Sequence, residues 1–452
     1  MLPVYTRLFN PEQFGEIEMV LIVTGLLKIF YNLGLDSAQS ILFYKYKLDQ
    51  KRLISSILQY RLIFGGGILF LSFILFPLVN KLILNNSLSN SFFIIAFLGC
   101  FFNLIAEQCA QVFRLSYKPK QYLAINIITS LFSSLFIIIF SYIIGNGILG
   151  YFQGFLLGGI FAMVYGIYKA REYISLFKLN SFYWKSLFKF GIPLVGSGFS
   201  FYVLNSADRW FINWKLTSHD LGLYVVAFKF SAILMLFGQT FRMAWNPIAF
   251  NLIRSEDDNR PFFQLVSKLY LGFGVALALI LTLFSKLLVL LVTTKEYYDA
   301  FPLVGVLCFG SILYGFYPTI NLGFWKKQKT HLDFLATSVG AISNVILNYI
   351  FIQKFGVFGV ALATTLSQFI WIITTMYISE SLWKINYPYF RFLLVGVVGF
   401  GSSIIIIELI KTDSYIIGSL VTLVGSVLSI LFTIGTSEFK KNISLLRKYK
   451  LY

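Results

Sequence analysis

A polar stripe runs through an otherwise apolar segment near the start of the chain, and a lysine lies at its centre. The stripe repeats at steps of four, four, four and three residues: Thr24, Lys28, Asn32, Asp36 and Gln39. This spacing places the five side chains on one face of an α-helix. Lys28 lies roughly 18 Å beyond Glu16 along such a helix. If the helix crosses a bilayer with an apolar core about 30 Å thick, the ammonium group lies near the midplane, where a charge indicates a functional site.

Three further apolar segments carry shorter stripes of the same kind. Lipid offers no hydrogen-bond partners, so each stripe is predicted to face a watery interior. They comprise Asn103, Glu107 and Gln111; Gln239, Arg242 and Asn246; and Ser197, Asn205 and Asp208.

Three cations, Lys28, Arg61 and Arg242, are predicted to lie deep in the membrane. Facing lipid, they would cost on the order of 8–10 kcal/mol together, which rivals the stability of a typical fold. They must therefore line a cavity, pair with acids, or both. Arg209 and Lys229 lie nearer the predicted outer surface, which their long side chains can reach.

Two interpretations of these cations remain open. A cavity with more cations than nearby acids suits an anionic ligand, and this is the interpretation we favour for the set. Alternatively, individual cations form ion pairs within the bundle. Arg209 would then pair with Asp208, and Lys28 with Asp36 or Glu107.

The composition determines the class of protein that must hold these residues. Of the 452 residues, 58% are hydrophobic and 12% are charged, which is typical of a polytopic membrane protein. The net charge of +18 lies in short loops, where it indicates topology and contact with anionic lipids rather than nucleic acid. The three cysteines lie in apolar segments and show no metal-ligand or disulfide spacing. There is no phosphate-binding loop or nucleophile motif, so neither an enzyme nor a cofactor is predicted.

Long apolar runs with short polar breaks predict an all-α protein with about fourteen membrane spans. The first, Met1–Phe9, is too short to cross alone and is interpreted as the end of a helix whose beginning is missing. The basic breaks fall on one side, so both termini are predicted to be cytoplasmic. The other runs are near 17–42, 53–79, 91–113, 121–144, 148–168, 191–213, 221–250, 264–292, 301–325, 331–352, 356–379, 388–410 and 414–436.

An internal repeat relates the two halves of the chain. The stretch PEQFGEIEMV from Pro11 resembles SHDLGLYVVA from Ser218, and Gly147 and Gly150 align with Gly356 and Gly359. Six spans separate the copies, so the repeats run parallel. We therefore predict two six-helix transmembrane lobes, residues 1–180 and 181–385, with a cavity between them. Two extra helices and a basic tail follow at 386–452.

Two segments resemble Wzx-type polysaccharide flippases. LPVYTRLFNPEQFGEIEMV carries the family's LP-x-Y-T-R and P-E-x-[FY]-G stretches and leads to a helix that ends in LGLDSAQS. FGIPLVGSGFSFYVLNSADRW, from Phe190, carries G-x-P-L and N-S-x-D-R, followed by an acidic–apolar–Gly–x–Tyr turn. The matching positions are Pro11, Gly15, Gly34, Pro193, Asn205, Asp208, Arg209 and Gly222.

The resemblance implies a MATE-like fold of the MOP exporter superfamily and an inner-membrane protein of bacteria. It implies transport of undecaprenyl-diphosphate-linked oligosaccharide units by alternating access. Membrane lipids, a polysaccharide polymerase and a chain-length regulator would be its partners. The cavity would bind the diphosphate through its cations and the sugars through polar residues: Lys28, Asn32, Asp36, Arg61, Glu107, Asn205, Asp208, Arg209, Lys229 and Arg242.

Three alternatives remain. An ion-coupled multidrug exporter of the same superfamily would depend most on Asp36, Glu107 and Asp208. A flippase for the cell-wall precursor lipid II is hardly separable from the first interpretation by sequence. A membrane-embedded polymerase usually carries a large outer loop, whereas the longest stretch between spans here, Lys169 to Phe190, is predicted to be cytoplasmic.

Overall fold

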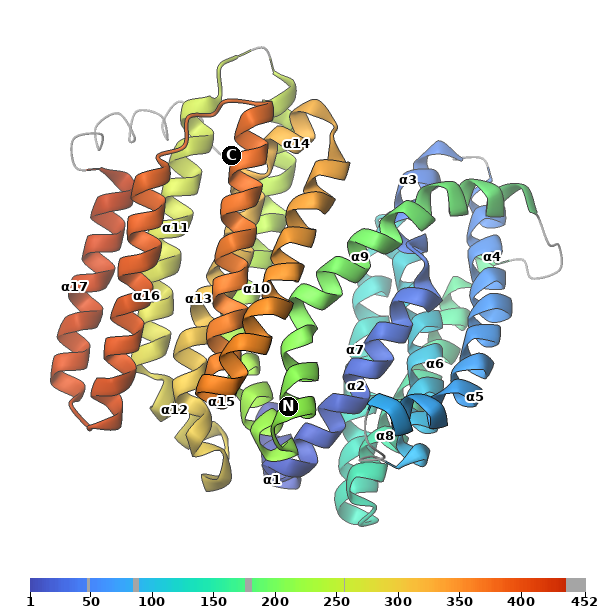
Figure 1. The fold of residues 1–452 in the computed structure, drawn as a ribbon. Helices are drawn as coiled ribbons and strands as arrows, with labels where there is room; N and C mark the ends of the chain where they lie inside the picture. The colour runs from blue at the N-terminus through green and yellow to red at the C-terminus, as the bar shows by residue number, and fades with distance from the viewer. Residues whose placement is uncertain (47–48, 84–88, 175–180, 256, 436–452) are drawn as a thin grey trace. The chain divides into compact units, whose positions relative to one another are not determined.

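The computed structural model describes residues 1–46, 49–83, 89–174, 181–255 and 257–435, and these ranges contain helices but no strand (Figure 1). The predicted all-helical class is confirmed. The chain divides into two compact units, residues 3–202 and residues from 203 onward. The division falls inside one long helix, α9 (Ser181–Lys215), whose two ends therefore belong to different units.

In the first unit, α6, α7 and α8 pack closely because small residues of α8 lie against their neighbours. A Cβ atom on Gly158 would lie 2.5 Å from Cα of Ser133 in α7, and one on Gly166 would lie 2.9 Å from Cβ of Cys109 in α6. Two short π-helices, η1 and η2, interrupt the unit's membrane helices. The elements are α1 (Leu2–Leu8), α2 (Pro11–Asn32), α3 (Leu35–Lys45), α4 (Gln50–Tyr60), η1 (Arg61–Gly65), α5 (Gly66–Ile83), α6 (Asn90–Leu115), α7 (Pro119–Ile138), η2 (Ile139–Ile143), α8 (Gly147–Ala170) and η3 (Arg171–Tyr173).

The helix that carries the first polar stripe is broken where the sequence predicted continuity. Leu33 and Gly34 adopt left-handed conformations, with φ of 42° and 70°, and separate α2 from α3. The backbone of Gly34 lies against that of Gly191 in the first half of α9. Tyr202 of α9 also donates a hydrogen bond of 2.6 Å to the carbonyl oxygen of Ile22. Helix α9 therefore contacts the broken helix at the break and within α2.

Replacing Gly34 with alanine is expected to destabilise the protein. A left-handed conformation costs an alanine about 1–2 kcal/mol, and the new Cβ would also collide with the carbonyl oxygen of Gly191. Denaturant unfolding of the purified protein measures the loss. Gly66→Ala is the matched control, because Gly66 is helical and a Cβ there would have no neighbour within 4 Å. If the two variants are equally stable, the backbone at Gly34 does not require glycine.

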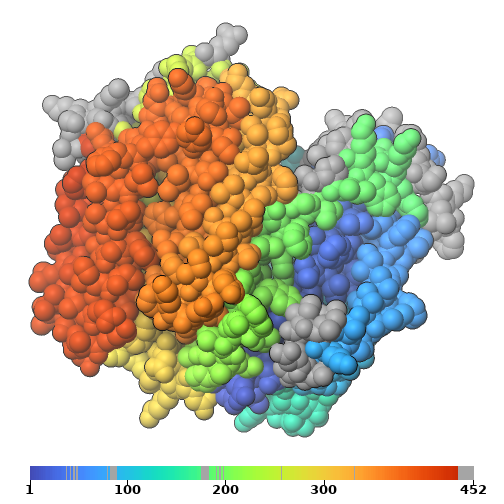
Figure 2. Space-filling model, in the orientation of Figure 1, coloured from blue at the N-terminus to red at the C-terminus, as the bar shows by residue number. Residues whose placement is uncertain are grey.

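The second unit contains the remaining helices. In the space-filling view, the side chains of α15, α16 and α17 close the gaps that the ribbon leaves between these helices (Figure 2). The elements are the second half of α9, α10 (Ser218–Arg254), α11 (Arg260–Leu283), α12 (Ser285–Val292), η4 (Lys295–Ala300), α13 (Phe301–Ile320), α14 (Leu322–Lys327), α15 (Thr330–Leu382), α16 (Tyr389–Lys411) and α17 (Tyr415–Ile434).

The predicted internal repeat has counterparts in local conformation. Both α2 and α10 begin with a capping box, in which the side chains of Asn10 and Thr217 accept hydrogen bonds from the backbone three residues later. The aligned glycines Gly147 and Gly356 both have positive φ, 52° and 56°. Helix starts and turns therefore recur where the sequence alignment placed them.

Ten helices in the described ranges are long and apolar enough to cross a membrane. One of them, at 331–382, joins two predicted spans across the bend at Gly356. Helix α2, which carries three glutamates and Lys28, is not among the ten. The total of fourteen spans stays a prediction, and the basic tail at 436–452 lies outside the described residues.

Candidate functional site

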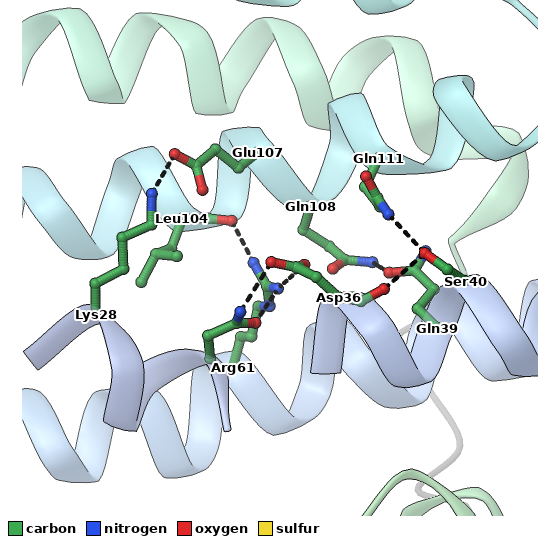
Figure 3. Close-up of polar contacts among 10 residues, drawn as sticks. Lys28, Asp36, Gln39, Ser40, Arg61, Leu104, Glu107, Gln108 and Gln111 are labelled. Carbon is green, nitrogen blue, oxygen red and sulfur yellow. Dashed lines mark hydrogen bonds and ion pairs between the residues drawn. The ribbon is translucent and has the colours of Figure 1, made fainter. Parts of the chain in front are cut away.

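The first polar stripe meets the stripe of α6 and forms an ion pair in the first unit (Figure 3). Nζ of Lys28 in α2 lies 2.6 Å from Oε1 of Glu107 in α6. The two side chains are 43% and 48% exposed. A half-exposed ion pair in a membrane segment must face water or a ligand, since neither group can hydrogen-bond to lipid.

Arg61, by contrast, is a buried clamp at the break between α2 and α3. Its side chain is 3% exposed and lies in the π-helix η1. One guanidinium nitrogen donates to Oδ1 of Asn32 at 2.9 Å and to Oδ1 of Asp36 at 2.6 Å. The other donates to the carbonyl oxygen of Leu104 in α6 at 2.7 Å. Arg61 thus ties both sides of the break to two other helices.

Amides and a hydroxyl extend this network along α3 and α6 (Figure 3). Gln108 donates to Gln39 at 2.9 Å, and Gln111 donates to the hydroxyl of Ser40 at 3.2 Å. Gln39 and Gln108 are almost fully buried. In the described part of the chain, one polar atom of each amide has no hydrogen-bond partner. These side chains align α3 with α6 rather than offer a surface for a ligand.

The charge balance of this cluster differs from the favoured sequence interpretation. Lys28 and Arg61 each contact one carboxylate, of Glu107 and Asp36 respectively. In this cluster the cations therefore do not outnumber the acids, and the ion-pair interpretation describes both residues. Of the two cations, only Lys28 is exposed enough to exchange its partner for a soluble or lipid-linked anion.

Asp208 forms a second polar centre, inside the second unit. Its carboxylate is 1% exposed. It accepts a hydrogen bond from the hydroxyl of Tyr224 in α10 and one of 2.9 Å from the backbone N–H of Arg209. Tyr224 also lies 3.2 Å from the hydroxyl of Thr364 in α15. Buried polar groups joined in this way hold α9, α10 and α15 together.

Arg209 is buried beside this carboxylate, as the pairing alternative predicted. Its guanidinium lies 4.0 Å from Oδ1 of Asp208 and donates to the carbonyl oxygen of Asn205 at 2.9 Å. It also lies 4.3 Å from the ring centre of Phe228. These contacts hold the α9 segment around Arg209 against α10. Lys229, also on α10, is exposed. The side chains of Pro193 and Ser197 lie outside the described residues.

Arg242 is exposed on α10 and makes no ion pair within the described ranges. A further acid, Asp333 at the start of α15, is bound by a tyrosine of another helix. Both carboxylate oxygens of Asp333 accept from the hydroxyl of Tyr317 in α13, at 2.7 Å. Sequence reasoning did not select Asp333 or Tyr317. An acid within the predicted span 331–352 was the available signal.

The described part of the chain contains no group of three or more His, Cys, Asp or Glu side chains able to hold a metal ion. Of the three cations predicted to lie deep in the membrane, Lys28 is half-exposed and Arg242 is exposed, whereas Arg61 is buried. Lys28 and Arg242 are therefore the two that an anion can reach.

Two family models match the chain. The model described as polysaccharide biosynthesis protein matches residues 1–253, which is more than half of the chain. The model described as MatE matches residues 193–350. A curated relative, the lipid II flippase MurJ of Thermosipho africanus (strain TCF52B), is 35% identical over 68 residues. That match spans 15% of this chain and 14% of the relative.

Solved structures show the same fold over most of the chain. MurJ in an inward closed conformation matches with a TM-score of 0.71 at 18% identity, covering 94% of this chain and 93% of MurJ. An inward-facing multidrug resistance MATE family transporter of the MOP superfamily matches with a TM-score of 0.70 at 13% identity, covering 85% of this chain and 94% of the transporter. The predicted MATE-like fold is confirmed. The chain belongs to the polysaccharide biosynthesis protein family, and it shares its fold with MurJ and with a MATE family transporter of the MOP superfamily.

Proposed function

We propose that the protein flips undecaprenyl-diphosphate-linked oligosaccharide units across the bacterial inner membrane. One observation carries the proposal: Lys28 forms a half-exposed pair with Glu107 of α6, a helix long and apolar enough to cross a membrane, in a chain from the polysaccharide biosynthesis family. A charged pair that is neither buried nor able to face lipid requires a polar partner inside the membrane. A diphosphate supplies such a partner.

The binding step is an exchange of anions at Lys28. A diphosphate carries more negative charge than one carboxylate, so it competes with Glu107 for the ammonium group. Asn32, four residues away on the same face, remains engaged with Arg61 and Asp36. Lys28 is therefore the residue of this cluster that contacts the substrate, and Arg61 positions the helix that carries it.

Transport proceeds by alternating access. The diphosphate and sugars leave the cytoplasmic leaflet for the polar interior while the polyprenyl tail stays in lipid. Release on the other side lets Glu107 recover Lys28, which neutralises the empty site. Both termini face the cytoplasm, and a polysaccharide polymerase and a chain-length regulator act on the exported unit.

Lipid II is the second candidate substrate, because one curated relative and the solved structure with a TM-score of 0.71 are both MurJ. Lipid II presents the same diphosphate to Lys28. A cation-coupled drug exporter has less support. Asp36, Glu107 and Asp208 each contact a cation or a hydrogen-bond donor, so a coupling ion would have to displace these partners.

The decisive experiment expresses the chain in bacteria that lack their own polysaccharide flippase, lack MurJ activity, or are sensitive to drugs. We expect it to restore surface polysaccharide and neither of the other two functions. In the same cells, Lys28→Gln with Arg242→Gln should abolish export. The control, Lys295→Gln with Lys354→Gln, removes two exposed lysines elsewhere and should export normally.

Two outcomes would overturn the proposal. Normal export by the Lys28 and Arg242 double variant, at normal protein level, would exclude an anion site at these cations. Rescue of the MurJ-deficient strain alone would assign lipid II as the substrate instead.

A further inference from the structure

A group of cations and tyrosines lies where α6, α7, α8 and η3 come together in the first unit. It uses none of the residues proposed to contact the transported substrate. We call it the basic–aromatic cluster, and it comprises Lys118, Tyr165, Tyr168, Lys169, Arg171 and Tyr173.

On one side of the cluster, Lys118 contacts the ring of Tyr173. Its Nζ lies 5.2 Å from the ring centre of Tyr173 in η3, and that ring lies 6.0 Å from Phe113 of α6 in an edge-to-face contact. The neighbouring Tyr173 side chain raises the pKa of Lys118 above its ordinary value. The start of α7 is therefore held against η3 and the end of α6.

The other two cations flank Tyr168 at the end of α8. Nζ of Lys169 lies 5.6 Å from the ring centres of both Tyr165 and Tyr168, and Cζ of Arg171 lies 4.8 Å from the Tyr168 ring. Lys169 and Arg171 are exposed, and Tyr168 is 56% exposed. A cation on a ring face keeps its N–H donors available for an anion.

The local sequence makes the cluster strongly positive. The stretches 114–120 and 165–173 contain two further cations, Arg114 and Lys120, and a single acid, Glu172. Five positive charges against one negative charge attract a multivalent or phosphate-bearing anion.

Exposed apolar strips on α7 and α8 begin next to the cluster. The ring of Phe132 on α7 stacks on that of Phe161 on α8, with centres 5.2 Å apart, so the two helices present their strips side by side. The exposed members are Leu123, Ile127 and Leu131 on α7 and Phe161 and Val164 on α8.

We propose that the basic–aromatic cluster binds the head group of an anionic phospholipid. Its acyl chains lie along the strips on α7 and α8. The occupant must carry both a phosphate and acyl chains, because the cations end where the apolar surface begins. Tyrosine and basic side chains together are typical of the membrane interface, and each cation near an anionic surface contributes about 1 kcal/mol.

The test compares lipid retention by the full-length protein and its variants, using phosphatidylglycerol as the probe and phosphatidylcholine as the neutral reference. Delipidated protein is titrated with each lipid in detergent, and bound lipid is counted by native mass spectrometry. Lys118→Gln, Lys169→Gln and Arg171→Gln together should weaken phosphatidylglycerol binding at least tenfold, since each charge is worth about fivefold. Single Lys169→Gln serves if the triple variant does not fold.

The matched control removes three exposed cations from basic loops of the second unit: Arg254→Gln, Lys327→Gln and Lys329→Gln. Strong phosphatidylglycerol binding should survive in this control. An equal loss in both triple variants would overturn the proposal and show a general charge effect. Displacement of the lipid by millimolar inorganic phosphate would overturn it too, because the acyl strips would then contribute nothing. The titration measures lipid binding and not export, so its result does not depend on the identity of the transported substrate.

Discussion

Exchanging Lys28 and Glu107, by Lys28→Glu with Glu107→Lys, is expected to leave a folded protein that no longer exports. The exchange keeps opposite charges at the two positions of a half-exposed pair, whose native charged atoms lie 2.6 Å apart. Such pairs contribute only about 0–1 kcal/mol, so stability should barely change. The cation, however, moves from α2 to α6. A charge-assisted hydrogen bond of about 1.5–3 kcal/mol to the diphosphate is lost, and export should fall by roughly 10- to 150-fold.

Export of lipid-linked sugar, normalised to the amount of folded protein in the membrane, is the measurement. Lys28→Arg is the matched control, because it keeps a cation on α2 and should retain much of the activity. Lys28→Gln should lose export as the exchanged pair does. If the exchanged pair exports normally, Lys28 serves only to pair with Glu107, and the diphosphate binds elsewhere.

The sequence predicted which polar side chains share one helix face better than it predicted which residues of other helices they contact. The four-residue steps of the first stripe put Lys28, Asn32 and Asp36 on one face, and the structure shows all three directed at neighbouring helices. Periodicity depends only on the geometry of one helix. Which cation meets which acid depends on how distant segments pack, and the pairing of Lys28 with Glu107 joins residues 79 positions apart.

The break at Gly34 shows a second limit of local reasoning. The run 17–42 is apolar enough to predict one helix, and isolated glycines such as Gly25 and Gly34 are tolerated inside a helix. Two consecutive left-handed residues persist there because Gly191 leaves room for the backbone and Arg61 binds both sides of the break. Both contacts come from other helices, so the sequence of residues 17–42 alone cannot predict them.

Burial separates Arg61 from Lys28, although their predicted depths were similar. A charge count along the chain treats both as cavity cations. In the structure Arg61 is buried and donates hydrogen bonds to α2, α3 and α6, whereas the Lys28 side chain is 43% exposed. The two residues should therefore fail in different ways when they are replaced.

Replacing Arg61 with leucine is expected to lower the free energy of unfolding by about 1.5–3 kcal/mol, the size of hydrogen bonds to a charged group. The loss stays below that of a fully buried ion pair, because Asp36 is 41% exposed and remains hydrated. The variant loses hydrogen bonds to Asn32, Asp36 and the Leu104 carbonyl. Denaturant unfolding of the purified protein measures the change. Arg61→Lys keeps the charge without the planar fork, so it should lie between leucine and the native arginine.

A double-mutant cycle distinguishes loss of the Arg61–Asp36 contact from a general loss of packing. Arg61→Leu and Asp36→Leu should couple by at least about 1 kcal/mol, since the two groups contact each other directly. Arg61→Leu with Glu107→Leu is the matched cycle and should be nearly additive, because Glu107 pairs with Lys28. Export by Arg61→Leu should decline in step with the amount of folded protein, whereas Lys28→Gln loses export at normal protein level. If Arg61→Leu unfolds like the native protein and still loses export, Arg61 contacts the substrate and the clamp assignment is wrong.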